Sequence, residues 1–123
     1  MIAAAELRSI CVGFPGSGET FPFGPEPSVF KVAGKMFALS RLAERPLRVS
    51  LKCEPPLAEQ LRAAHRAVLP GYHLNKRHWN TVIIDGSMGE ETIRDMIEDS
   101  YDLVVSKLPS SRRRALGWGP DQA

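Results

Sequence analysis

The chain has 123 residues, of which 43% are apolar and 24% charged, with a formal net charge of +2. This length allows one domain around one core and leaves no room for a second folded unit. Two cysteines without a Cys-x-x-Cys spacing argue against a disulfide-stapled secreted scaffold. The absence of a long apolar run argues against a membrane-spanning helix. We therefore expect a cytoplasmic protein that does not enter membranes.

The small net charge conceals an uneven distribution. Residues 27–80 carry ten Lys and Arg against three Glu, whereas residues 81–108 carry two cations against seven Asp and Glu. Three further arginines, at positions 112–114, supply most of the overall excess. A fold that gathers residues 27–80 on one face would present a basic surface, which suits an anionic partner.

The chain opens with a predicted helix and a loop. Residues 3–12 place apolar side chains at helical spacing and end before a glycine and a proline. Residues 13–20 match the spacing of a phosphate-binding G-x-x-x-x-G-K-[ST] loop, except that Glu19 stands in place of the lysine. Because this change reverses the charge that a phosphate requires, we interpret the segment as a turn.

A two-residue hairpin is predicted next. Residues 29–32 and 35–39 are mostly apolar, and Ala33-Gly34 between them suits a tight turn. Such a closure would pair Phe30 with Phe37 toward the core and Lys31 with Met36 on the other face.

A third strand and a second helix follow. Residues 47–52 alternate strictly, so Val49 and Leu51 are expected inward and Arg48, Ser50 and Lys52 outward. Residues 55–67 begin with prolines and carry an apolar stripe, which predicts a helix that covers the sheet.

The second half predicts two strands and a long helix. The strands are expected at residues 72–74 and 79–84. Ser87 and Glu90 have the spacing of a capping box, which would start an amphipathic helix that continues to Leu108. We expect residues 1–108 to form the domain and residues 109–123 to form a basic, flexible tail, with Leu116 and Trp118 as its candidate anchors.

Five motifs give the chain a family resemblance: Phe21-Pro-Phe-Gly-Pro25, residues 29–38, Val49-Ser-Leu-Lys-Cys53, residues 70–82 and Ser100-Tyr-Asp-Leu-Val104. Together they resemble the MmcQ/YjbR family over roughly residues 5–108. The residues that carry the motif most strongly are Gly71, Tyr72, His73, Asn75, Trp79, Asn80 and Thr81.

The resemblance implies an α+β fold, a two-layer α/β sandwich like that of bacterial secretion chaperones. Its order is helix, three strands, helix, two strands, helix, with a five-stranded antiparallel sheet and the helices on one face. Members of this family are commonly labelled DNA-binding, because their shape is similar to the double-wing domain of a phage transcription factor. Shape similarity transfers function poorly, so DNA remains one expectation among others.

For DNA, the expected contacts are to phosphates. Seven residues would make them, three on the open sheet face and four at its edge: Lys31, Arg48, Lys52, Lys76, Arg77, His78 and Trp79. The alternative is that these cations only keep an uncovered sheet face solvated and block edge pairing. Similarly, the aromatic and amide groups of residues 72–80 either stack on a base or hold a small ligand, or they tie their loop to its neighbours.

A protein-binding module is the competing class. Met36, Ala38 and Ser40 would then lie beside the cations on the open face and meet a partner or a second copy. We expect no cofactor and no metal site, because His73 and His78 lack a completing cysteine or carboxylate at a familiar spacing. We also expect no enzymatic activity, since Cys53 ends an apolar strand, where an inert thiol is usual.

Overall fold

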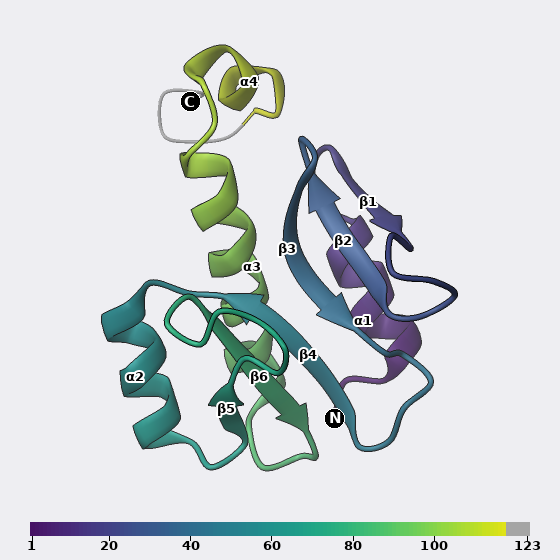
Figure 1. The fold of residues 1–123 in the computed structure, drawn as a ribbon, viewed down its shortest axis with the longest axis vertical. Coiled ribbons are helices and arrows are strands. Elements are labelled where there is room, and N and C mark those ends of the chain that lie inside the picture. The colour runs from purple at the N-terminus through teal and green to yellow at the C-terminus, as the bar shows by residue number, and fades with distance from the viewer. Residues whose placement is uncertain (118–123) are drawn as a thin grey trace.

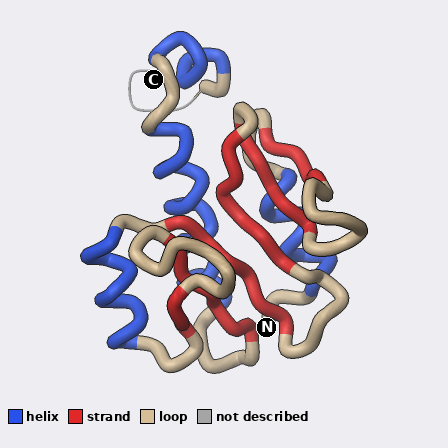
Figure 2. The backbone as a smooth tube through the Cα atoms, in the orientation of Figure 1, coloured by secondary structure: helices blue, strands red, loops and turns tan. Residues whose placement is uncertain are grey.

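The computed structural model describes residues 1–117, which form an antiparallel sheet with helices packed on one of its faces (Figure 1, Figure 2). The helices are α1 (Ala4–Val12), α2 (Pro55–Ala64), α3 (Glu90–Ser106) and α4 (Ser110–Ala115). The strands are β1 (Ser17–Thr20), β2 (Ser28–Val32), β3 (Lys35–Ser40), β4 (Leu47–Lys52), β5 (Val68–Pro70) and β6 (Trp79–Ile84).

The strands lie in the order β1-β2-β3-β4-β6-β5, and every neighbouring pair is antiparallel. Helix α1 contacts β1, α3 contacts β2 to β4, and α2 contacts β5 and β6. The core between the layers contains Leu7, Phe30, Phe37, Val49 and Ile97, all at most 1% exposed. The expected α+β architecture is confirmed, but the sheet has six strands rather than five.

The additional strand is β1, where the sequence predicts a turn. Glycines and serines give this segment little β propensity, so side-chain patterns do not reveal it. The strand pairs with β2 from Ser17 to Thr20. It is also held by side chains, because the Ser17 hydroxyl donates to the Cys11 carbonyl at 2.8 Å and that of Thr20 to the Val29 carbonyl at 3.0 Å.

The β2–β3 hairpin has the predicted two-residue turn but a different register. Ala33 and Gly34 have φ angles of 51° and 77°, as a type I′ turn requires, and Lys31 lies opposite Met36. A register shift between Phe30 and Lys31 places Ala38, not Phe37, opposite Phe30.

Because of that shift, the residues exposed on the open face of the sheet differ from those expected. An extra residue in one strand lets two consecutive side chains point the same way, and both Phe37 and Ala38 are fully buried in the core. Ser40 is buried too, with its hydroxyl bonded to the Arg48 carbonyl. Of the three residues expected beside the cations, only Met36 remains partly exposed.

The segment before β6 also differs from expectation. Residues 72–74 form no strand; instead α2 ends at Ala64 and the strand comes earlier, as β5, pairing Val68 with Val82. Residues 71–78 become the connection between β5 and β6. The predicted capping box is wrong as well. Gly89 precedes α3, and the Ser87 N–H bonds to the Asp85 carboxylate in a turn.

The segment expected to be a flexible tail contains α4. Leu116, just beyond this helix, is half-buried against the core, and a Cβ at Gly16 would lie 2.4 Å from its Cδ2. Trp118, the other candidate anchor, lies outside the described residues. Within residues 1–117, no helix combines the length and the apolar character needed to cross a membrane.

Candidate nucleic-acid interface

The 71–78 loop is fixed to the sheet by close backbone contact. Gly71 donates its N–H to the Trp79 carbonyl at 2.9 Å. A Cβ at Gly71 would lie 2.7 Å from the Trp79 Cβ and 3.0 Å from its carbonyl oxygen, closer than real side chains approach. Glycine is therefore required here by space.

The start of the loop folds over the open face of the sheet. Thr81 and Ser50 face each other on β6 and β4, their hydroxyls 2.9 Å apart, and the Thr81 hydroxyl also accepts the Tyr72 N–H at 3.0 Å. Both residues are only 4% exposed, because the loop covers them. His73 follows with φ of 58°, a conformation that ordinary side chains adopt rarely.

The two asparagines of the motif satisfy polar groups of the loop and helix. The Asn75 side chain accepts the Arg77 N–H at 2.9 Å. Asn80 is 1% exposed; its oxygen accepts from Arg62 at 3.3 Å and its nitrogen donates to the Ala58 carbonyl at 3.4 Å. These contacts support the interpretation that much of the motif ties the loop to its neighbours.

A basic hollow of about 320 Å³ lies where β4 ends and the loop returns to the sheet. Its walls come from a strand, the loop and a helix: Lys52, Glu54, Asn75, His78, Trp79, Leu103 and Lys107. The backbone is fixed there, since the Cys53 N–H bonds to the His78 carbonyl at 2.8 Å and Lys52 lies opposite Trp79. Three nominated residues, Lys52, His78 and Trp79, thus meet in one place.

A second polar hollow, of about 340 Å³, lies on the open face beside the 71–78 loop. It is lined by Leu39, Ser40, Arg41, Glu44, Arg48, Ser50, Tyr72, His73 and Thr81. The Arg48 guanidinium is paired with the Glu44 carboxylate and lies 5.9 Å from the centre of the Tyr72 ring. Arg41 is paired as well, with the Glu26 carboxylate at 3.8 Å. Because carboxylates offset both arginines that line this hollow, it is less attractive to phosphate than the basic hollow.

The other cations that the sequence predicts as phosphate contacts lie outside the lining of the basic hollow. Lys31 is on β2, separated from β4 by β3. Lys76 and Arg77 are exposed on the loop, with the Lys76 ammonium bonded to the Gly71 carbonyl at 2.9 Å. The structure therefore divides the seven residues into three that line the basic hollow and four that lie outside its lining.

The sequence did not predict Lys107 as part of the site, and it predicted a more exposed side chain for Trp79. Lys107 directly follows α3, and only the packing of α3 against the sheet brings it to the hollow. Trp79 is 8% exposed, so it forms a wall and offers little ring surface for stacking on a base.

Two other chemistries receive no support from the described residues. Nowhere in residues 1–117 do three or more His, Cys, Asp and Glu side chains gather at a spacing that would hold a metal ion. Burial, followed by the carboxylates of Asp99 and Glu54, raises the pKa of the Cys53 thiol. This is opposite to the shift that activates a nucleophilic cysteine.

The fold and this loop define a class: small α+β proteins with an open antiparallel sheet, helices on one face and a tethered loop on the other. The YjbR family model matches residues 12–103. The chain belongs to the YjbR family.

Relatives and a solved structure extend the match to nearly the whole chain. An uncharacterised protein YjbR of Escherichia coli K12 is 38% identical over 112 residues, 91% of this chain and 95% of the relative. Protein YbdF of Escherichia coli O157:H7, also uncharacterised, is 40% identical over 88 residues, 72% of each chain.

The crystal structure of Deinococcus radiodurans protein DR2400, with a DUF419 domain, is 43% identical with a TM-score of 0.89 and covers 97% of this chain and 91% of that one. A Pseudomonas syringae structure is 31% identical with a TM-score of 0.61, covering 71% of this chain and 86% of that one.

Proposed function

We propose that the protein binds nucleic acid through the basic hollow, in a cytoplasmic and non-catalytic role. The observation that carries the proposal is the convergence of Lys52, His78 and Lys107 from a strand, a loop and a helix on one hollow. Phosphate is the group that such a cluster recognises, and phosphate contacts dominate affinity for nucleic acids. Glu54 is the acidic residue among those lining the hollow.

The chain segments that supply His78 and Lys107 carry further cations. Lys76 and Arg77 precede His78 on the loop, and both are exposed. Beyond Lys107, α4 carries Arg112, Arg113 and Arg114, with the first and last exposed. Phosphate contacts from these side chains would add affinity without the sequence readout that base edges provide.

Fluorescence anisotropy with labelled single-stranded and duplex DNA, at low and moderate salt, tests the proposal. We expect binding that weakens as salt rises, and Lys52→Glu or Lys107→Glu should weaken it and lower the salt slope by about 1. Arg66→Glu is the control, because this exposed arginine lies outside the lining of the hollow. No binding at low salt, or equal affinities for Lys107→Glu and Arg66→Glu, would contradict the proposal.

A protein-interaction module is the second candidate, and exposed aromatics favour it. Phe21 and Phe23, between β1 and β2, are 49% and 67% exposed, and solvated rings of this size often mark contact surfaces. Light scattering after gel filtration separates the two candidates. A protein that associates through these rings should change its mass in solution on Phe23→Glu, with little dependence on salt.

A further inference from the structure

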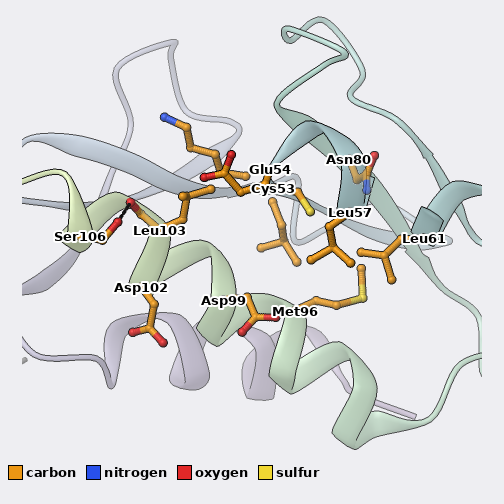
Figure 3. Close-up of a pocket in the computed structure, with 12 residues that line it drawn as sticks. Cys53, Glu54, Leu57, Leu61, Asn80, Met96, Asp99, Asp102, Leu103 and Ser106 are labelled. Atoms are coloured by element: carbon orange, nitrogen blue, oxygen red, sulfur yellow. Dashed lines mark hydrogen bonds between the residues drawn. The ribbon is translucent and has the colours of Figure 1, made fainter. Parts of the chain in front are cut away.

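A groove with largely apolar walls lies between α2 and α3, on the helical side of the sheet (Figure 3). It encloses about 330 Å³ and is lined by Leu51, Lys52, Cys53, Glu54, Leu57, Leu61, Asn80, Met96, Asp99, Asp102, Leu103 and Ser106. We propose that this interhelical groove binds a basic amphipathic segment of another protein, whose apolar side chains enter it. This interaction is separate from nucleic-acid binding.

The apolar part of the groove is arranged to receive side chains. Leu57 and Leu61 lie one turn apart on α2, and Figure 3 shows both pointing toward Met96 of α3. Leu57 is 40% exposed, so its burial by a partner would be favourable. Methionine adapts its shape to varied partners, which suits a docking surface.

The charge of the groove selects a cationic partner. Asp99 and Asp102 line it from α3 and Glu54 from the start of α2, whereas Lys52 is the cation among the lining residues. Partial burial, then the carboxylates of Asp102 and Asp95, raises the pKa of Asp99. A Lys or Arg side chain placed here would offset that repulsion, and an anionic partner would increase it.

The length of the groove favours a segment of chain over a small amine. The lining runs along α3 from Met96 to Ser106, which at 1.5 Å per residue spans about 15 Å. One ammonium group would meet a single point on this wall. A short helix with apolar residues on one side and cations on the other would meet both the leucines and the carboxylates, as in other helix-in-groove complexes.

The groove adjoins the basic hollow but differs from it in charge. The two share Lys52, Glu54 and Leu103 as lining residues. Leu57 and Asp99 belong to the groove alone, so changes there test the groove without altering the proposed phosphate contacts.

The probe is an acetylated and amidated peptide of about 14 residues, long enough to form a helix, with leucines on one face and lysines on the other. Titration into the ¹⁵N-labelled full chain, without nucleic acid, should shift the amide signals of Leu57, Met96 and Asp99. A peptide of the same pattern with glutamates in place of lysines should leave them unchanged. Shifts confined to other surfaces would overturn the proposal.

Two matched pairs of variants sharpen the test. Leu57→Lys should weaken peptide binding about tenfold, equivalent to about 1.4 kcal/mol. Leu69→Lys, at a leucine of β5 that is also 40% exposed, should not. Asp99→Asn should weaken binding more than Glu59→Gln, at an exposed residue outside the groove lining. Equal affinities within either pair, or shifts at these residues with phenethylamine but not with the peptide, would overturn the proposal.

Discussion

The hydroxyl of Ser100, in the middle of α3, accepts a hydrogen bond from the Lys52 N–H at 2.8 Å. The same hydroxyl donates to the Phe37 carbonyl at 2.6 Å. Ala38 and Leu51 are the last residues that pair β3 with β4, and these two backbone groups belong to the residues next to them. A helix side chain thus satisfies the groups that the next strand pairing would otherwise satisfy. The bond also fixes Lys52, which lines both the basic hollow and the interhelical groove.

Ser100→Ala should destabilise the protein by about 2 kcal/mol. The substitution removes one partner from two backbone groups, and an unsatisfied buried polar group costs about 1–3 kcal/mol. Urea unfolding at neutral pH would measure the difference. Ser106→Ala, at an exposed serine whose hydroxyl bonds to the Leu103 carbonyl, should change stability by less than about 0.5 kcal/mol. Equal effects of the two substitutions would show that Ser100 does not connect the strands.

Gly71→Ala should destabilise the protein by about 1–3 kcal/mol, the usual cost of inserting a methyl group into filled space. The new Cβ would collide with Trp79, so the 71–78 loop would have to move. Thermal unfolding followed by circular dichroism would record the loss. Gly18→Ala is the control, because a Cβ there meets nothing within 4 Å. A Gly71→Ala protein as stable as this control would contradict the close approach.

The elements that the sequence predicted well are those with strong side-chain patterns. Residues 47–52 alternate between apolar and polar side chains, and α3 has an apolar helical periodicity. Each pattern is compatible with burial of one face only, so it predicts both the element and its orientation. The sequence could not show β1, because Ser17 and Gly18 have no apolar pattern and are held by pairing with β2. It also could not show the register shift between β2 and β3. One extra residue in β3 has no signature in the amino-acid pattern, yet it makes the Ala38 side chain point toward the core.

The candidate site was predictable where a motif or a strand pattern marks its residues. His78 and Trp79 stand out in a single motif, and Lys52 follows from strand alternation. Lys107 enters the basic hollow through the packing of α3 against the sheet, a long-range contact that no local pattern encodes. The nomination of Arg48 overlooked Glu44, whose pairing depends on the geometry of the β3–β4 connection.

Stability should fall in alkaline solution because Cys11 is buried as a neutral thiol. Burial, with a smaller effect of Glu19, raises the pKa of Cys11 from 9.0 to about 12. The raised value favours the folded state fully below pH 9 and progressively less as pH rises toward 12, because only the unfolded chain ionises. The free energy of unfolding should therefore drop by about 2 kcal/mol between pH 8 and pH 10.5 from this group.

Urea unfolding of the native chain and of Cys11→Ala over this range would check the assignment. The variant starts from lower stability, since it loses buried volume. Its loss between the two pH values should nevertheless be smaller than that of the native chain. Burial also raises the pKa values of Tyr101 and Cys53, so some alkaline dependence should remain. Identical losses in the two proteins would exclude Cys11 as the source.

Asp99→Asn should accelerate alkylation of Cys53. The Asp99 carboxylate contributes to the raised pKa of this thiol, second to burial, so removing its charge lowers the pKa and increases the reactive thiolate at pH 8. Iodoacetamide is the suitable reagent, because it is uncharged and its approach does not depend on the charge of the groove. Mass spectrometry would follow modification of Cys53, while Cys11, fully buried, should react only on unfolding. Glu59→Gln should leave the rate unchanged, since burial, Asp99, Glu54 and Arg62 act on this thiol and Glu59 does not. A pH–rate midpoint that stays in place in Asp99→Asn would show that the Asp99 carboxylate does not contribute to the raised pKa of Cys53.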